Sequence, residues 1–227
     1  MIEIIKNFFN KNVYERIVSG IFFIIPFVFL IIEGGLFFVL FFIILLVIII
    51  FEFIASTKDR SNIVIKFLTI SFFIVSFFHF IFLRISFDDF IINYLLYIIF
   101  SIWIFDSFSL IGGRLIGGKK LIPQISPNKT ISGFISGLVS LLFFSILLMI
   151  IYNQTMLIIL TTLLIGIISF IGDAIESYCK RLLKIKDFSN LLPGHGGIID
   201  RMDAFMLIFF LHYILTISSF NPIIFYV

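Results

Sequence analysis

LFFVLFFIILLVIIIFEFIA, residues 36–55, is an apolar run of twenty residues in which Glu52 is the only charged one. An α-helix of about 20 apolar residues is long enough to span the hydrocarbon core of a bilayer. In a soluble protein, a helix that is apolar on all sides has to be buried on all sides. The segment therefore predicts a membrane-spanning helix, and the fold depends on how many similar runs the chain contains.

Six further apolar runs of similar length occur in the 227 residues, which predicts an all-α polytopic membrane protein with about seven transmembrane helices. The predicted spans are 17–32, 36–55, 67–83, 90–110, 133–152, 155–175 and 203–219. Composition agrees, because 61% hydrophobic and 13% charged residues leave too little charge to cover a water-exposed surface. We expect one membrane domain over 1–227, with residues 1–16 as an interfacial amphipathic segment and no cleavable signal peptide.

The basic residues predict the orientation of these spans. With the N-terminus in the cytoplasm, fifteen of the sixteen Lys and Arg residues fall on the cytoplasmic side, and only Arg84 falls outside. This asymmetry follows the positive-inside rule. It predicts a multi-pass protein of the plasma (inner) membrane whose two long polar loops, 111–132 and 176–202, face the cytoplasm. The basic residues form no patch on a soluble face, which excludes nucleic-acid binding.

Acidic residues near the second polar loop indicate a metal site. Asp173 and Glu176 are three residues apart, as are Asp200 and Asp203, and residues at that spacing share a helix face. Carboxylates that face one site form an oxygen environment suited to Mg²⁺ rather than to zinc. The basic side chains that accompany them can hold phosphate oxygens: Lys180, Arg181, Lys184, Lys186 and Arg201.

Glycine-rich and polar turns complete the pattern. Residues 193–197, with His195, Gly196 and Gly197, form a turn that lets backbone N–H groups approach an anion at a helix start. Acids, bases and this turn together fit metal-assisted phosphoryl or nucleotidyl transfer. In the first loop, the polar turn 126–130 can present Lys129 to a phosphate. The run 113–120 is similar to a P-loop, but it ends in Lys and follows no βαβ unit, so that interpretation is rejected.

The two segments together resemble a known family. Ser177–Asp203 has the pattern S-x-x-K-R-x4-K-D-x-S-x2-L-P-G-H-G-G-x2-D-R-x-D, which resembles the signature of phosphatidate cytidylyltransferases. The upstream pattern D-S…G-R…S-P-x-K-T, Asp106–Thr130, is similar to a second block of that family. The motif-bearing region is 103–203, and the N-terminal spans are similar only in being hydrophobic.

The resemblance implies transfer of a cytidylyl group from CTP to phosphatidic acid with Mg²⁺, and a homodimer among membrane lipids. We expect Asp106 either to bind a second cation such as K⁺ or to orient a base. The resemblance assigns metal binding to Asp173, Asp200 and Asp203, with support from Glu176. The catalytic residues that it implies are Asp173, Asp200, Lys180 and Arg201. The substrate-binding residues that it implies are Ser126, Lys129, Thr130, Arg114, Asp106, Arg181, Lys186, Asp187, His195, Gly196 and Gly197.

Departures from the family pattern leave alternatives open. Residues 131–132 are Ile-Ser where the family commonly has Trp-Glu, 188–189 are Phe-Ser rather than Ser-Gly, Ser136 stands where the family often has Gly, and Cys179 where it usually has an aliphatic residue. One alternative is nucleotidyl transfer to another lipid phosphate. Two others belong to different classes: a transporter that uses the intramembrane carboxylates, and a non-catalytic membrane partner.

Three residues in the spans are predicted to be structural. His79 and His212 have apolar neighbours, so we expect each to form hydrogen bonds inside the helix bundle. Glu52 lies near the end of its span, where we expect it to pair with Lys58 or Arg60.

Overall fold

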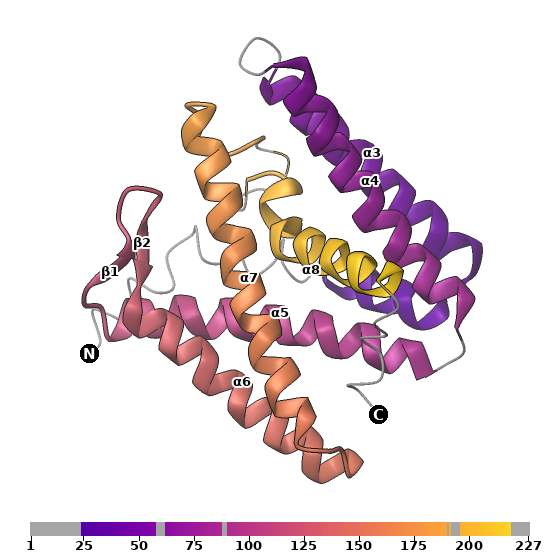
Figure 1. The fold of residues 1–227 in the computed structure, drawn as a ribbon, viewed down its shortest axis with the longest axis vertical. Helices are drawn as coiled ribbons and strands as arrows, with labels where there is room; N and C mark the ends of the chain where they lie inside the picture. Colours follow the sequence, from indigo (N-terminus) through magenta and orange to yellow (C-terminus); the bar gives the residue numbers. More distant parts are fainter. Residues whose placement is uncertain (1–23, 58–61, 88–89, 190, 192–195, 219–227) are drawn as a thin grey trace.

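The computed structural model describes residues 24–57, 62–87, 90–189, 191 and 196–218, whose course is drawn in Figure 1. A short helix, Ile24–Glu33, comes first. The labelled elements that follow are α3 (Gly35–Thr57), α4 (Ile63–Ser86), α5 (Phe90–Leu115), β1 (Lys120–Ile122), β2 (Ser126–Thr130), α6 (Ile131–Tyr152), α7 (Leu157–Leu182) and α8 (Ile199–Ile217).

Five of these helices, α3 to α7, are long and apolar enough to cross a membrane, and each overlaps one predicted span. The coarse prediction, a helical integral membrane protein, is confirmed. The last predicted span lies on α8, which is not among those five. Residues 17–23 of the first predicted span and the whole segment 1–16 lie outside the described residues, so seven spans and a cytoplasmic N-terminus stay predictions.

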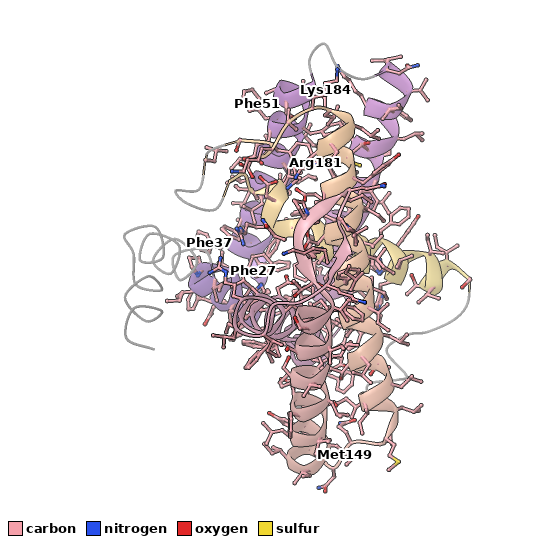
Figure 2. The ribbon with its side chains drawn as sticks, turned by 90° about the vertical axis from the view of Figure 1, so that its left-hand side faces the viewer. Phe27, Phe37, Phe51, Met149, Arg181 and Lys184 are labelled. Carbon is pink, nitrogen blue, oxygen red and sulfur yellow. The ribbon has the colours of Figure 1, made fainter. Side chains whose placement is uncertain are left out.

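The basic end of α7 and the far end of α6 lie at opposite ends of the molecule (Figure 2). Figure 2 shows Met149, near the end of α6, far from Arg181 and Lys184 at the opposite end of the molecule. The loop between α6 and α7, residues 153–156, carries no charged residue. The uncharged loop agrees with a predicted outer loop, and the orientation of the helices in the membrane stays a prediction.

A short antiparallel hairpin follows α5, where the sequence predicted only a polar turn. Lys120 pairs with Thr130 and Ile122 with Ser126, with an irregularity in register between them. Gly117 and Gly118 have φ values of +66° and +102°, which glycine adopts without strain, and they turn the chain out of α5. Strands of three and five residues are too short to show a clear alternating pattern in the sequence.

Strand β2 runs into α6 without a linker. Thr130 is both the last residue of β2 and the N-cap of α6, where its hydroxyl accepts a hydrogen bond from Gly133 N at 3.1 Å. The neighbouring residue Lys129 is thereby held at a fixed position relative to the start of α6.

Small residues bring α5 and α6 into close contact. A Cβ atom on Gly133 would lie 2.5 Å from the Ser109 carbonyl oxygen, and one on Gly137 would lie 2.7 Å from carbons of the Phe105 ring. Small residues four apart allow such close approach of helices within a bilayer. This contact fixes the hairpin-bearing ends of the two helices next to each other.

We expect Gly137→Leu to destabilise the protein by about 1–3 kcal/mol, because the larger side chain has no room against α5. Thermal unfolding in detergent, followed by circular dichroism, would measure the change. Val139→Leu is the matched control, since Val139 lies on the same helix and is 45% exposed. Equal melting temperatures for the two variants would contradict the close-contact interpretation.

An aromatic core attaches α8 to α3 and α4. The rings of Phe80, Phe205 and Phe209 lie 4.6–5.0 Å apart between centroids, and Phe42 lies 4.8 Å from Phe80. Figure 1 shows α8 (yellow) between α7 and the α3–α4 pair. This packing brings the first turn of α8 next to α7.

The two histidines of the predicted spans bond to each other. His79 Nε2 and His212 Nδ1 are 2.7 Å apart, and both side chains are buried. The prediction that each forms hydrogen bonds inside the bundle is confirmed.

Candidate functional site

A cavity of about 890 Å³ lies among α5, the hairpin, α6, α7 and the first turn of α8. Its wall contains most of the residues that the sequence singled out, although they come from segments far apart in the chain. The predicted site residues that line it are Asp106, Arg114, Lys129, Thr130, Asp173, Lys180, Asp187, Asp200, Arg201 and Asp203.

Three carboxylates converge in this cavity. Asp173 and Glu176 come from one face of α7 and Asp203 comes from α8, and one oxygen of each lies within 4.8 Å of the others. Gly172 permits this, because a Cβ there would lie 3.0 Å from the Ala204 Cα where α7 and α8 touch. The acid cluster Asp173–Glu176–Asp203 presents a set of oxygen donors that suits Mg²⁺.

One oxygen of the cluster is free to accept a further interaction. Among the described residues, Glu176 Oε1 is buried and has no hydrogen-bond partner. A buried carboxylate oxygen without a partner is costly unless a cation or a donor satisfies it. The donor set therefore fits a divalent cation, which Asp173, Glu176 and Asp203 would hold.

Two lysines neutralise the acids. Lys129 Nζ of β2 lies 2.6 Å from Asp173 Oδ2 and 4.6 Å from the centroid of the Phe170 ring. Lys180 Nζ lies 2.8 Å from Glu176 Oε2 and 2.9 Å from Asp200 Oδ1. Buried carboxylates need such partners, because an unpaired charge away from water is strongly destabilising.

Asp200 is placed differently from the cluster. Its Oδ1 accepts from Lys180, and its Oδ2 accepts from Gly197 N at 2.7 Å and from Phe188 N at 3.3 Å. Burial alone would raise the pKa of Asp200, but the hydrogen bonds that it accepts and the nearby Lys180 ammonium lower it below the ordinary value. The third member of the acid cluster is Glu176 rather than Asp200, and metal binding by Asp200 stays a prediction.

Several predicted substrate-binding residues do not line the cavity in the described part of the chain. Arg181, labelled in Figure 2, donates from Nε to the Ile125 carbonyl at 3.2 Å and so attaches the hairpin to α7. Gly196 has a φ of +82°, and a Cβ there would lie 2.8 Å from Asp200 Oδ2. Ser126, Lys186 and Gly197 are likewise outside the cavity wall. His195 lies outside the described residues.

The structure adds residues that the sequence did not single out as site residues. Lys120 and Asn128 of the hairpin line the cavity, as do Ser107 and Ser109 of α5. The polar turn 126–130 was a usable signal for Asn128, and the Lys-Lys pair at 119–120 was one for Lys120. Ser107 and Ser109 follow Asp106 closely, but serine in an apolar span gives no specific signal.

Ser132, one of the departures from the family pattern, has a structural role here. Its hydroxyl donates to the Gly117 carbonyl and is 3.0 Å from the Thr130 hydroxyl. These bonds attach the start of α6 to the turn that follows α5. Ser132 is not among the residues that line the cavity.

Glu52 makes contacts that the sequence did not predict. Lys58 and Arg60, its predicted partners, lie outside the described residues. The Glu52 carboxylate instead accepts hydrogen bonds from Ser189 Oγ, Ile198 N and Ile199 N. It therefore connects α3 to the start of α8.

The cavity wall combines opposite chemical characters. The acid cluster and the basic side chains of Lys129, Lys180 and Arg114 lie on it together with Trp103 and Phe134. Such a wall can hold phosphate groups and a cation at one part and an apolar chain at another. A ligand with a phosphate group and an apolar chain would contact both the charged part and the apolar part of this wall.

Comparison with known proteins gives a consistent family. A model described as "Cytidylyltransferase family" matches residues 56–219. Proteins named "Phosphatidate cytidylyltransferase" are 42% identical over 130 residues in Staphylococcus haemolyticus (56% of this chain, 50% of that protein), 41% over 131 residues in Staphylococcus aureus (56% and 50%) and 37% over 136 residues in Bacillus subtilis (58% and 51%). The chain spans about half the length of the curated relatives it matches.

Proposed function

Because this chain belongs to the cytidylyltransferase family, whose model matches residues 56–219, we propose that it transfers a cytidylyl group from CTP to phosphatidic acid. The products are CDP-diacylglycerol and pyrophosphate, and the role is in phospholipid biosynthesis. One observation carries the proposal: the acid cluster and Lys129, which contacts Asp173, lie together in a cavity whose wall is partly apolar.

The reaction joins two anions. An ionised phosphate oxygen of phosphatidic acid attacks the α-phosphorus of CTP, a new P–O bond forms, and the bond from the α-phosphorus to the oxygen bridging to the β-phosphorus breaks. Pyrophosphate leaves with the electron pair of that bond. No general base is needed, because the attacking oxygen carries no proton. The chief obstacle is repulsion between like charges, which positioned cations reduce.

The basic residues of the cavity supply part of that neutralisation. Lys129 and Arg114 are placed to hold phosphate oxygens from the side of the hairpin and α5, and Arg201 is placed to do so from α8. Lys180 keeps Glu176 and Asp200 in position. A Mg²⁺ ion held by Asp173, Glu176 and Asp203 would neutralise charge on the triphosphate. Asp106 accepts a hydrogen bond from Ser169 at 3.3 Å and is the proposed site for a second cation such as K⁺.

The membrane location supports the same substrates. Phosphatidic acid lies at the headgroup level and CTP is dissolved in the cytosol, so a cavity at the polar ends of the helices meets both. We place it on the cytoplasmic face of the plasma membrane, on the basis of the positive-inside rule. The homodimer implied by the resemblance stays a prediction.

The experiment supplies the purified protein with phosphatidic acid in mixed micelles, Mg²⁺ and labelled CTP. We expect CDP-diacylglycerol and pyrophosphate in equal amounts, and neither product with EDTA. Product with a polyprenyl phosphate but not with phosphatidic acid would change the acceptor. No product with either lipid would favour the non-catalytic interpretation, and a separate flux assay in vesicles tests transport.

A further inference from the structure

The start of α8 lacks a capping side chain of its own. The N-cap residue is Ile198, which forms no side-chain cap hydrogen bond, and Ile198 and Ile199 are both buried. The first N–H groups of a helix have no partner within the helix, so burial makes an external acceptor necessary. This start carries Asp200, Arg201 and Asp203 in its first turns.

Glu52 of α3 supplies the acceptor from a distant part of the chain. Its Oε1 accepts from Ile198 N at 3.1 Å and from Ser189 Oγ at 2.6 Å, and its Oε2 accepts from Ile199 N at 3.1 Å. The side chain is 2% exposed. A carboxylate at the N-terminus of a helix also interacts favourably with the helix dipole.

The surrounding backbone makes room for this carboxylate. A Cβ on Gly197 would lie 2.8 Å from Glu52 Oε2 and 3.0 Å from Ser189 Oγ. Glycine at 197 therefore allows Glu52 to approach the chain that enters α8. Two carboxylates share three successive N–H groups, since Asp200 takes that of Gly197 and Glu52 takes those of Ile198 and Ile199.

We propose that Glu52 is a positioning residue for the reaction, which it supports by fixing the first turn of α8. This inference rests on the proposed function. Glu52 precedes the part of the chain that the family model matches, which starts at residue 56. It is not part of the cavity wall and acts through Asp203, a member of the acid cluster, and Asp200, the partner of Lys180.

Loss of Glu52 has a definite consequence for the site. The N–H groups of Ile198 and Ile199 lose their acceptor, and the first turn of α8 shifts to satisfy them elsewhere. Asp200 is the nearest remaining carboxylate on this turn, and any bond that it makes to them competes with Lys180. The acid cluster then loses the placement of Asp203 from α8.

The test compares Glu52→Gln and Glu52→Ala in the 227-residue chain, with Glu33→Gln as the matched control. Glu33 is exposed on the helix Ile24–Glu33. We expect kcat to fall about 10- to 100-fold, because partners that orient metal ligands have effects of that size. The KM for CTP should change little, the Mg²⁺ concentration for half-maximal activity should rise, and the alanine variant should be the more affected. Ser189→Ala in the Glu52→Ala background should add almost nothing.

Two readouts do not need turnover. Hydrogen exchange should speed up in peptides covering 198–203 of the Glu52 variants, and Mn²⁺ should bind about tenfold more weakly by electron paramagnetic resonance. A variant with wild-type kcat and exchange overturns the proposal, and so does one whose melting temperature falls while kcat and Mn²⁺ affinity stay unchanged. If the wild type itself makes no product, the proposed function fails and the Mn²⁺ and exchange measurements decide the role of Glu52.

Discussion

Asp203→Asn is expected to reduce cytidylyl transfer about 1,000-fold, which corresponds to about 4 kcal/mol of activation free energy. The substitution keeps the shape of the side chain but removes the negative charge that α8 contributes to the acid cluster. The acid cluster would then keep only its two carboxylates from α7. Product formation under single-turnover conditions, with Mn²⁺ binding measured in parallel, would test the expectation.

The controls separate charge from folding. Asp203→Glu retains the charge one methylene farther out and should recover part of the Mn²⁺ affinity. Asp203→Asn should melt at or above the wild-type temperature, because a buried carboxylate near two others is itself unfavourable. More than one tenth of wild-type activity in Asp203→Asn would exclude this residue from the cation site.

Lys180→Met is expected to destabilise the folded protein by about 3–5 kcal/mol and to remove most activity. The Lys180 ammonium lies 2.8 Å from Glu176 and 2.9 Å from Asp200, and all three side chains are largely buried. Without it, two buried carboxylates lose their common counter-charge. Chemical unfolding in mixed micelles would give the change in stability, and the CTP assay the change in rate.

A second substitution tests the cause of that instability. Asp200→Asn in the Lys180→Met background removes one of the two uncompensated charges, so the double variant should be more stable than Lys180→Met alone. Activity should stay low in both. If the two substitutions destabilise independently and additively, the ion pair is not what holds this part of α7 to α8.

The helical framework could be predicted because the signal is in composition and length. Each of α3 to α7 overlaps an apolar run that the sequence marks, and polar residues at the ends of α5 and α7 mark the site. The spacing of Asp173 and Glu176 correctly indicated one helix face. The hairpin escaped prediction, because its strands are short and β2 includes Pro127, which cannot donate a backbone hydrogen bond.

The features that the sequence did not predict depend on contacts between segments far apart in the chain. No periodicity connects Glu52 to residues 198 and 199, which are separated from it by more than half of the chain. The roles of Asp200 and Glu176 could not be separated by spacing either, because both lie three residues from another acid. Only the position of Lys180 between them and the approach of α7 to α8 at Gly172 distinguish them.

The direct passage from β2 into α6 connects the thickness of the bilayer to the position of one ammonium group. Of the five candidate spans, α6 has the smallest buried share, so most of its residues are left uncovered by the rest of the described chain and are open to lipid. A lipid-facing helix accommodates a thinner or thicker bilayer by changing its tilt. Because Thr130 ends β2 and caps α6, no flexible linker separates α6 from Lys129. A change in the tilt of α6 therefore moves the Lys129 ammonium relative to Asp173, so the length of the surrounding acyl chains affects the distance between these two groups.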